Sequence, residues 1–467
     1  MTARLALAVS AAVALACGDT LIDHGGSAFL HTSGGGGGGG SGGGGPGLAC
    51  QAPNHVCGDA CVAEDASSCS DACTVCPAAP AHATGVCSSH ACGFQCSPGY
   101  LRCAAGCCTA IAVAGGAAHT CAVASDGSVA CWGANDAGQL GLASTIQQSL
   151  SPAIVTGISG ATAVAAGGSH ACAIASGAAW CWGSNALGQL GDGTTTSSAT
   201  PVAVTGLAGV ALKDIVAGGS HTCGRAASGA VYCWGDNGAG QLGSSTVGVN
   251  SSTPAQVSAL AATALAAGQR HTCALAAEAV KCWGSNDFGQ LGAGALGVNS
   301  PVPVTPLGSN SISVAAGVGH TCAGQKAGSA LCWGAGASGQ LGNNATPATQ
   351  AGPVALQPVT TFVMSSFTAA DAFTCATGPS GAVKCWGSNA SGQIGIGATG
   401  GPVTSPTDTE LASGAQAVAA GGAHACALVQ DSAPPGDVTV RCWGANDRGQ
   451  VGDGTSTQRP TPTPISG

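Results

Sequence analysis

Residues 217–243 read AGGSHTCGRAASGAVYCWGDNGAGQLG, and this stretch carries the pattern that decides the fold. Its parts are an Ala-Gly-x-x-His-Thr-Cys segment that ends at Cys223, a Cys-Trp-Gly triplet at 233–235, and an Asn-x-x-Gly-Gln-Leu-Gly segment that ends at Gly243. The triplet occurs seven times, each time between versions of the other two parts, and begins at Cys131, Cys181, Cys233, Cys282, Cys332, Cys385 and Cys442. Copies at a spacing of about 50 residues indicate a repeat architecture.

The copies are rich in glycine and β-branched residues and show no helical period, which is typical of short antiparallel strands joined by turns. Seven small sheets predict a closed β-propeller, because propellers commonly have about four to eight blades. The expected fold class is therefore all-β, a seven-bladed propeller over residues 110–467 preceded by a small disulfide-rich segment.

The repeat resembles that of the regulator-of-chromosome-condensation family, whose members form seven-bladed propellers. The resemblance covers residues 110–467 and rests on seven in-order copies of a multi-residue motif. This sequence differs from the nuclear members in one respect, which is a pair of cysteines in every copy.

Each copy brackets a tight turn with two cysteines. In the first copy, Cys121 and Cys131 flank Ser125-Asp126-Gly127, so a hairpin folded at this turn places the cysteines opposite each other on neighbouring strands. The alternative is that the cysteines are small buried apolar residues with free thiols. We predict one disulfide per blade, in the pairs Cys121–Cys131, Cys172–Cys181, Cys223–Cys233, Cys273–Cys282, Cys322–Cys332, Cys375–Cys385 and Cys426–Cys442.

A histidine precedes the first cysteine of six copies, and the sixth copy has Phe373 instead. Adjacent Cys131 and Trp132 face opposite sides of a strand, so we expect each tryptophan to pack between blades, with the disulfide of its own blade on the other face. A ring of histidines could bind a metal or relay protons, but a residue repeated in every blade usually serves the blade. We therefore predict a packing role for the histidines and no catalytic, cofactor-binding or metal-binding residue. The histidines are His119, His170, His221, His271, His320 and His424.

Ring closure is predicted from the proline-led extended pieces, such as Pro152 to Val155 and Pro201 to Val204, that precede the inner copies. The first copy directly follows Cys108 and lacks such a piece, whereas the chain ends with one at Pro460 to Ile465. We expect this C-terminal strand to complete blade one and so remove the exposed sheet edges.

The N-terminus indicates export. Residues 1–17 resemble a signal peptide, with an apolar stretch from Leu5 to Ala16 that is too short to span a bilayer, which takes roughly 20 residues. Ala14-Leu15-Ala16-Cys17 resembles a bacterial lipoprotein box, which implies lipidation of Cys17; the alternative is ordinary cleavage. Residues 18–49 contain an almost pure glycine run and are expected to form a flexible tether.

Residues 50–108 contain twelve cysteines and too little apolar bulk for a core, so disulfides are expected to substitute for one. The CxxC of Cys73 and Cys76 could hold zinc, but a total of 27 cysteines favours an oxidising exterior in which disulfides form. We expect an extracytoplasmic protein at the outer membrane or surface of a bacterium, or a secreted one.

Composition narrows the function. Only 7% of residues are charged, and 11 lysines and arginines with a net charge of −9 cannot build a basic groove, so no nucleic-acid partner is expected. Acid–base groups are also few, and no Ser/His/Asp order, paired carboxylates or phosphate-binding loop is recognisable. We predict a non-enzymatic binding or scaffold protein, monomeric, joined to the membrane by its lipid anchor, whose partner is a protein or a cell-surface ligand.

Two alternatives come from resemblance alone. The family's namesake implies a regulator that exchanges guanine nucleotide on a small GTPase and binds chromatin. A similar secreted bacterial propeller that blocks β-lactamase implies an inhibitor of an enzyme.

The blade disulfides can be tested by peptide mapping without reduction, which should recover the seven pairs beginning with Cys121–Cys131. Each bridge closes a short loop and should stabilise the fold by about 2–3 kcal/mol, so reduction should lower the thermal unfolding temperature. Alkylation of all fourteen cysteines in the denatured, unreduced protein would contradict the pairing.

Overall fold

The computed structural model describes residues 54–57, 60–63, 78–88, 91–142, 146–357, 364, 366–430 and 436–467. These residues form strands and no helix, and accordingly none of their segments is a long apolar helix able to cross a membrane. The chain divides into two compact units, residues 1–79 with 84–95 and residues 80–83 with 96–467. Two hairpins lie near the start of the described chain: β1 (Asn54–Cys57) with β2 (Ala60–Ala63), and β3 (Ala83–Ser88) with β4 (Ala91–Cys96).

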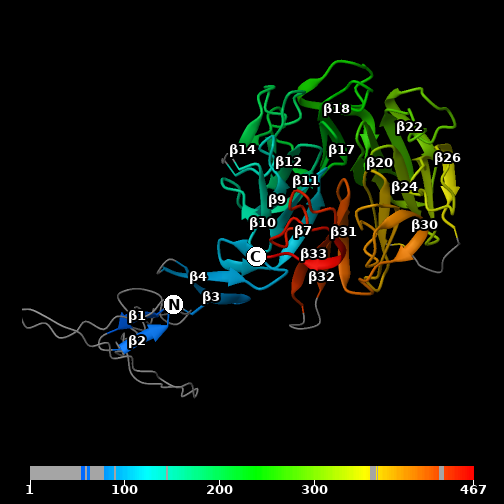
Figure 1. The fold of residues 1–467 in the computed structure, drawn as a ribbon. Coiled ribbons are helices and arrows are strands. Elements are labelled where there is room, and N and C mark those ends of the chain that lie inside the picture. Colours follow the sequence, from blue (N-terminus) through cyan, green and yellow to red (C-terminus); the bar gives the residue numbers. More distant parts are fainter. Residues whose placement is uncertain are drawn as a thin grey trace, which may run out of the picture. The chain divides into compact units, whose positions relative to one another are not determined.

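The larger unit contains seven four-stranded antiparallel sheets, which are the blades of a β-propeller (Figure 1). The expected fold class is confirmed. Each blade uses four consecutive strands, from the inner strand at the channel to the outer strand at the edge. Blade 1 has β7 (Ala110–Gly115), β8 (His119–Ala124), β9 (Val129–Ala134) and β10 (Gln148–Ile154); blade 2 has β11 (Ala161–Ala166), β12 (His170–Ala175), β13 (Ala178–Gly183) and β14 (Ser198–Ala203); blade 3 has β15 (Leu212–Ala217), β16 (His221–Ala226), β17 (Ala230–Gly235) and β18 (Ser251–Ala261); blade 4 has β19 (Ala264–Ala267), β20 (His271–Ala276), β21 (Ala279–Gly284) and β22 (Ser300–Leu307). Blade 5 has β23 (Ser311–Ala316), β24 (His320–Gln325), β25 (Ala330–Ala335) and β26 (Thr349–Ala355); blade 6 has β27 (Ser366–Ala369), β28 (Phe373–Thr377), β29 (Val383–Asn389) and β30 (Gly400–Asp408); blade 7 has β31 (Ala415–Ala420), β32 (His424–Gln430), β33 (Val438–Gly444) and β34 (Arg459–Pro464).

The expectation that the C-terminal strand completes blade one is wrong. β34 pairs with β33 of blade 7, where Cys442 lies opposite Thr463, and blade 1 has its own outer strand, β10. Each proline-led piece therefore belongs to the Cys-Trp-Gly copy that precedes it. Antiparallel pairing explains this, because the connection after the third strand turns the chain back along the same sheet.

The hydrophobic cores lie between neighbouring blades. Seven clusters of buried residues each span one such seam and contain one fully buried tryptophan. In the seam between blades 1 and 2, Trp182 of blade 2 packs in the same cluster as Cys121 and Cys131 of blade 1. The tryptophans therefore pack between blades, on the face opposite their own disulfide, as expected. Loss of such a side chain typically costs about 3–5 kcal/mol.

A short neck reinforces the seam where the ring closes. It consists of β5 (Leu101–Cys103) and β6 (Gly106–Cys108), with cysteine pairs Cys96–Cys107 and Cys103–Cys108. The Gly99 N–H donates to the carbonyl of Ile465 at 2.8 Å, and the Gly99 carbonyl accepts from the N–H of Val440 at 2.8 Å. Leu101 is fully buried in the core shared by blades 7 and 1. The ring thus closes by packing around the neck and not by a shared blade.

The outer strands all contain proline, which cannot donate to a further strand. Edge strands with this residue resist pairing with another chain. The prolines include Pro152, Pro201, Pro254, Pro301, Pro353, Pro402 and Pro460.

Candidate functional site

The structure places each predicted cysteine pair of the blades directly opposite on the second and third strands, as with Cys121 and Cys131. The sulfur atoms of the seven pairs lie 2.01–2.14 Å apart, and all fourteen residues are fully buried. This arrangement agrees with the predicted pairs. Disulfide bonding of these pairs in solution stays a prediction. Cys17, Cys73 and Cys76 lie outside the described residues.

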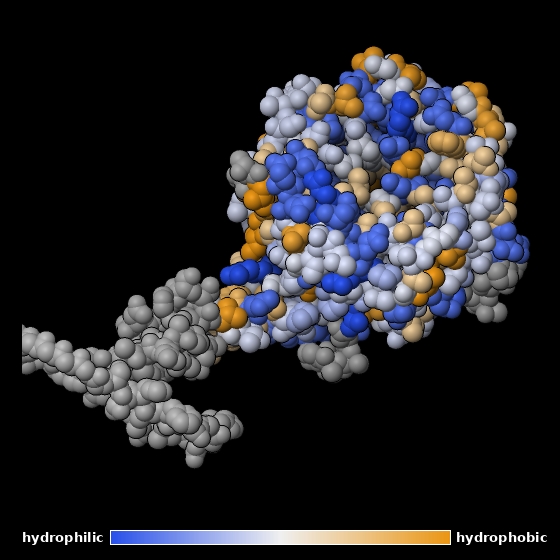
Figure 2. Space-filling model, in the orientation of Figure 1, coloured by the Kyte–Doolittle hydropathy of each residue, from blue (hydrophilic) through white to orange (hydrophobic). Residues whose placement is uncertain are grey.

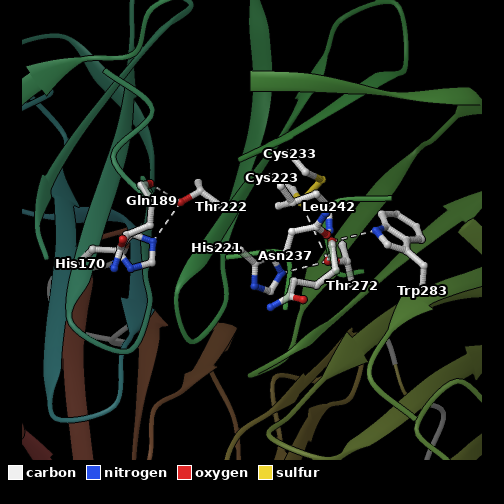
Figure 3. The surroundings of a disulfide bond; sticks show 11 residues. His170, Gln189, His221, Thr222, Cys223, Cys233, Asn237, Leu242, Thr272 and Trp283 are labelled. Carbon is white, nitrogen blue, oxygen red and sulfur yellow. Dashed lines mark hydrogen bonds between the residues drawn. A yellow bond between two sulfur atoms is a disulfide. The ribbon is translucent and has the colours of Figure 1, made fainter. Parts of the chain in front are cut away.

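A chain of hydrogen bonds joins blade 2 to blade 3. The Thr222 hydroxyl of blade 3 and the Trp234 indole N–H of blade 3 both donate, at 2.9 Å, to the backbone carbonyl of Gln189 in blade 2. His170 Nε2 of blade 2 lies 2.9 Å from Thr222 Oγ1. We call this arrangement of His, Thr, Gln and Trp the clasp. Figure 3 shows His170, Thr222 and Gln189 of this seam, with His221, Thr272 and Trp283 of the next.

The clasp determines the histidine tautomer. A threonine hydroxyl has one proton, and Thr222 gives that proton to the Gln189 carbonyl. His170 must therefore donate its Nε2–H to the hydroxyl oxygen, which leaves Nδ1 unprotonated. The glutamine carbonyl accepts two hydrogen bonds, so both of its lone pairs are used.

The Asn-x-x-Gly-Gln-Leu-Gly segment holds this carbonyl in place. The Asn185 side-chain oxygen accepts from the N–H of Leu190 at 2.9 Å, and the Gln189 side-chain oxygen accepts from the N–H of Leu187 at 3.0 Å. The side chains fold the turn while the backbone carbonyl of Gln189 faces the next blade. The complete clasp occurs at five seams, in the order His, Thr, Gln, Trp: His170, Thr222, Gln189, Trp234; His221, Thr272, Gln241, Trp283; His271, Thr321, Gln290, Trp333; His320, Thr374, Gln340, Trp386; and His424, Thr120, Gln450, Trp132.

The seam between blades 1 and 2 has an incomplete clasp. Trp182 still donates to the Gln139 carbonyl at 2.9 Å, but Ala171 stands where the threonine lies elsewhere. Neither ring nitrogen of His119 has a hydrogen-bond partner among the described residues. This seam therefore leaves a buried polar ring unsatisfied.

The seam between blades 6 and 7 also lacks the threonine, but it leaves no buried histidine ring without a hydrogen-bond partner. Phe373 replaces the histidine of blade 6, and Ala425 replaces the threonine of blade 7. The two substitutions match, because a phenyl ring needs no hydroxyl partner. Trp443 still donates to the Gln393 carbonyl at 2.9 Å.

Burial keeps the histidines neutral. Desolvation lowers the pKa of His170, His271 and His424 to about 3. It lowers the pKa of His119, His221 and His320 to about 4, although a backbone contact with His170 opposes the effect at His119. All six rings are fully buried within the blades, and five of them hydrogen-bond to a threonine of the next blade.

A glycine before each histidine is required by close contact. A β-carbon at Gly218 would collide with the His221 ring and with the carbonyl of Gly268 in the next blade. Blade 6 has Ala370 at this position, and that blade has Phe373 in place of the histidine. The first and third strands of each blade run to this end of the ring, so the glycine turns and the connections after the third strands lie there together. We call it the glycine end.

The central channel offers little chemistry. A cavity of about 180 Å³ lies at the glycine end, and one of about 260 Å³ lies between the inner strands. Asp371 is the one ionisable side chain among their lining residues, and partial desolvation raises its pKa although the residue is exposed. A lone carboxylate has no partner there for general acid–base catalysis. Among the described residues, the one cluster with metal-ligand spacing is Cys103, Cys108 and Asp126, whose two sulfur atoms are bonded to each other.

A sequence profile described as the Regulator of chromosome condensation (RCC1) repeat matches residues 126–174, 176–224, 228–275, 280–323 and 380–428. A second profile of the same description matches residues 110–139, 212–241, 262–290 and 415–450. The chain belongs to the RCC1 repeat family.

Curated proteins with RCC1-like segments match part of the chain. The Ultraviolet-B receptor UVR8 of Arabidopsis thaliana is 31% identical over 172 residues, which cover 36% of this chain and 39% of UVR8. The probable E3 ubiquitin-protein ligase HERC3 of Homo sapiens is 36% identical over 171 residues, which cover 36% of this chain and 16% of HERC3. The match thus spans less than half of either relative.

Solved structures share the RCC1 fold. Yeast RCC1 (Prp20), crystallised with Kap60, superposes with a TM-score of 0.65 at 22% identity, covering 72% of this chain and 83% of that chain. Human WBSCR16 gives a TM-score of 0.65 at 19% identity, covering 72% of this chain and 94% of that chain.

The threonine and the glutamine carbonyl of the RCC1 repeats are functional parts of the clasp that sequence reasoning missed. A signal was present, because copy six lacks the histidine and copy seven lacks the threonine, although copy two also lacks the threonine while copy one keeps its histidine. The link between those positions crosses a seam, so it is recognisable only when neighbouring copies are compared in pairs.

Ala171→Thr should complete the clasp between blades 1 and 2. The new hydroxyl would accept from His119 and donate to the Gln139 carbonyl, which should raise the free energy of unfolding by about 1 kcal/mol. Thr222→Ala should lower it by about 1–3 kcal/mol, because it leaves His170 without a partner. Urea unfolding at pH 7.5 measures both. An unchanged or lower stability for Ala171→Thr would show that the clasp does not stabilise the ring.

The buried histidines should make the RCC1 propeller acid-labile between pH 6.5 and about 4. Their pKa is lowered on folding from 6.5, so the unfolded chain binds more protons in this range, and stability falls as the pH falls. Each histidine contributes about 1.4 kcal/mol per pH unit in its window. The measurement is thermal unfolding at pH 7.5 and pH 5.0. His119→Phe, which copies the natural Phe373–Ala425 pair, should reduce the loss; an equal loss in both proteins would contradict this assignment.

Proposed function

We propose that this protein is a non-enzymatic binding protein that presents an RCC1-repeat propeller outside the cytoplasm and contacts a protein partner through its glycine end. The histidine, threonine and tryptophan side chains that repeat from blade to blade are buried in the clasps, so they are not available to a ligand. The two cavities of the channel have a single ionisable lining residue, Asp371, which supports binding over catalysis.

The observation that carries the proposal is the uneven distribution of exposed apolar side chains. Of the nine large apolar residues that are exposed in the described chain, six lie on blades 3 and 4: Val247, Val249, Phe288, Leu296, Val298 and Val302. Features shared by all blades serve the fold, whereas a feature confined to two blades is available for recognition.

Related proteins support a protein partner. Yeast RCC1 (Prp20) has been crystallised bound to Kap60, and a second yeast structure reports the binding of Prp20p to Gsp1p and histones. These relatives support the view that an RCC1 propeller can serve as a surface for binding a protein.

The location outside the cytoplasm is supported by the cysteine pairs of the blades and by the signal-like N-terminus. The predicted lipid on Cys17 and the tether at 18–49 would hold the propeller at the outer membrane or cell surface. Fully buried disulfides suit an oxidising compartment.

A photo-crosslinking experiment on intact producing cells tests the binding proposal. A photoreactive residue is placed at Thr195 or Thr246 at the glycine end, and at Ala208 or Ser380 at the opposite end as matched controls; all four positions are exposed. We expect a discrete adduct with one protein from the glycine end and none from the controls. Absence of any adduct from all four positions would overturn the proposed function.

Cys17→Ala tests the anchor separately. The thioether-linked lipid would be lost, so the variant should move from the membrane fraction to the soluble fraction or the medium. Cys17→Ser is a second variant that lacks the lipid and should behave in the same way. Identical fractionation of the variants and the wild type would show that the protein is not a lipoprotein.

A further inference from the structure

Six exposed apolar side chains lie on the adjacent blades 3 and 4. Val247 and Val249 are 49% and 67% exposed in the connection of blade 3, and Leu296 and Val298 are 49% and 66% exposed in that of blade 4. Phe288 (43%) lies within the second connection, and Val302 (46%) lies in β22, which follows it. We call these six residues the apolar patch. Figure 2 shows hydrophobic surface along this edge of the ring, over the connections that lead into β18 and β22 in Figure 1.

The blade 3 connection is held in one conformation. The N–H of Asn237 donates to the side-chain oxygen of Asn250 at 2.9 Å, and the N–H of Gly248 donates to the carbonyl of Asn237 at 2.9 Å. Gly248 has a φ of 83°, a turn that places Val247 and Val249 on either side of it. The patch is therefore preorganised, which reduces the entropic cost of binding.

The blade 4 connection repeats this arrangement. The N–H of Asn286 donates to the side-chain oxygen of Asn299 at 2.9 Å. The N–H of Gly297 donates to the carbonyl of Asn286, also at 2.9 Å. Gly297, with a φ of 71°, separates Leu296 from Val298. Two adjacent blades thus present an aliphatic pair in the same way.

A backbone hydrogen bond joins the blade 3 and blade 4 parts of the patch. The N–H of Ser245 donates to the carbonyl of Pro301 at 3.2 Å, which brings the blade 3 connection next to Val302. A β-carbon at Gly289 would lie 2.9 Å from Leu296 Cδ2, and one at Gly319 would lie 2.7 Å from Phe288 Cδ2. Leu296 and Phe288 therefore lie against the turns beside them and extend the patch towards blade 5.

The fold does not need these apolar residues. Blades 2 and 7 build the corresponding connection with Asp-Gly-Thr, in which the Thr194 hydroxyl bonds to Asp192 at 2.9 Å and Thr455 bonds to Asp453 at 2.8 Å. The sequence [Val/Leu]-Gly-Val-Asn-Ser occurs only in blades 3 and 4, at 247–251 and 296–300. A side chain that is exposed and dispensable for the turn is explained by what it contacts outside the chain.

The surroundings of the patch indicate the chemistry of its partner. Pro254 and Pro301 interrupt the outer strands of blades 3 and 4, so the partner is held by side-chain contacts and not by an added strand. Segments 236–250 and 285–302 contain Asp236 and Asp287 but no lysine or arginine. The exposed Arg270 of blade 4 lies beside Asp236, because a β-carbon at Gly238 would be 3.2 Å from both the Arg270 Nη2 and the Asp236 Oδ1, so Asp287 is the carboxylate left for a partner. Asp287 is exposed beside Phe288 and forms no ion pair among the described residues. An apolar surface with one carboxylate at its edge complements an apolar segment that carries a cation.

We infer that the apolar patch is a docking surface for an amphipathic polypeptide segment of a partner protein, with aliphatic side chains bordered by lysine or arginine. This inference rests on the proposed function and names the part of the glycine end that performs it. Aliphatic side chains of the segment cover the patch, and a cation of the segment pairs with Asp287.

The test uses the full chain and two fluorescent synthetic helical peptides of equal length, one of leucine and lysine and one of leucine and glutamate. We expect the lysine peptide to bind at least 10-fold more tightly than the glutamate peptide. The double variant Val249→Ser/Val298→Ser should weaken binding of the lysine peptide at least 10-fold, and Asp287→Asn should weaken it 2- to 5-fold. The matched control is Ile111→Ser/Ile312→Ser, which removes two isoleucines that are 50% and 44% exposed on the inner strands of blades 1 and 5.

Three outcomes would overturn the inference. The first is equal loss of binding in the control, or no loss in Val249→Ser/Val298→Ser at an unchanged unfolding temperature. The second is equal binding of both peptides, which would exclude charge pairing. The third is a dimer in sedimentation equilibrium, or binding to phosphatidylcholine vesicles, that the double variant abolishes, because a second copy or a membrane would then be the occupant. In the crosslinking experiment, an adduct at Thr195 without one at Thr246 would overturn the patch and leave the proposed function standing.

Discussion

The ring depends on one backbone oxygen at each seam, the carbonyl of the glutamine in the Asn-x-x-Gly-Gln-Leu-Gly segment. At Gln189 this oxygen accepts a hydroxyl proton from Thr222 and an indole proton from Trp234, both in the following blade. The site is buried, so water cannot replace either donor, and the loss of one would leave a polar group unsatisfied. The histidine behind the threonine completes the arrangement. Neighbouring blades are therefore joined by hydrogen bonds of fixed geometry as well as by hydrophobic packing.

The same interaction divides the ring into two arcs. Complete clasps join blades 2 to 6 in series, and another joins blade 7 to blade 1. The seams on either side of the second arc lack the threonine hydroxyl, at Ala171 and Ala425, and only the first of them leaves a buried histidine without a partner. The neck packs within the second arc, where Leu101 enters the core shared by blades 7 and 1. Packing at the closure seam thus adds to its clasp.

Repetition separates structure from function in this molecule. Histidine, tryptophan, glutamine and the cysteine pairs recur from blade to blade, and all are buried in the clasps, cores and cross-strand pairs. The connections after the third strands keep the clasp residues and differ in the residues that follow. In blades 2 and 7 those residues are an aspartate and a threonine that bond to each other, as at Asp192 and Thr194. In blades 3 and 4 they are aliphatic and exposed. The structural residues are therefore the same in most blades, whereas the binding surface that we propose is confined to blades 3 and 4.

The sequence by itself determined the number of blades, the all-β class, the pairing of Cys121 with Cys131 across a turn, and the position of tryptophan between blades. All of these follow from local rules, because turn chemistry and the alternation of a strand operate over a few residues. The assignment of Pro460 to Ile465 to blade one failed, because local order does not say which neighbouring copy an extended piece pairs with. Only the tertiary structure decided that β34 belongs to blade 7, that His170 meets Thr222, and that Val302 lies beside the connection of blade 3. The reason is physical: the last two contacts join neighbouring blades, as His170 and Thr222 are 52 positions apart, and their proximity arises when the blades pack as a ring.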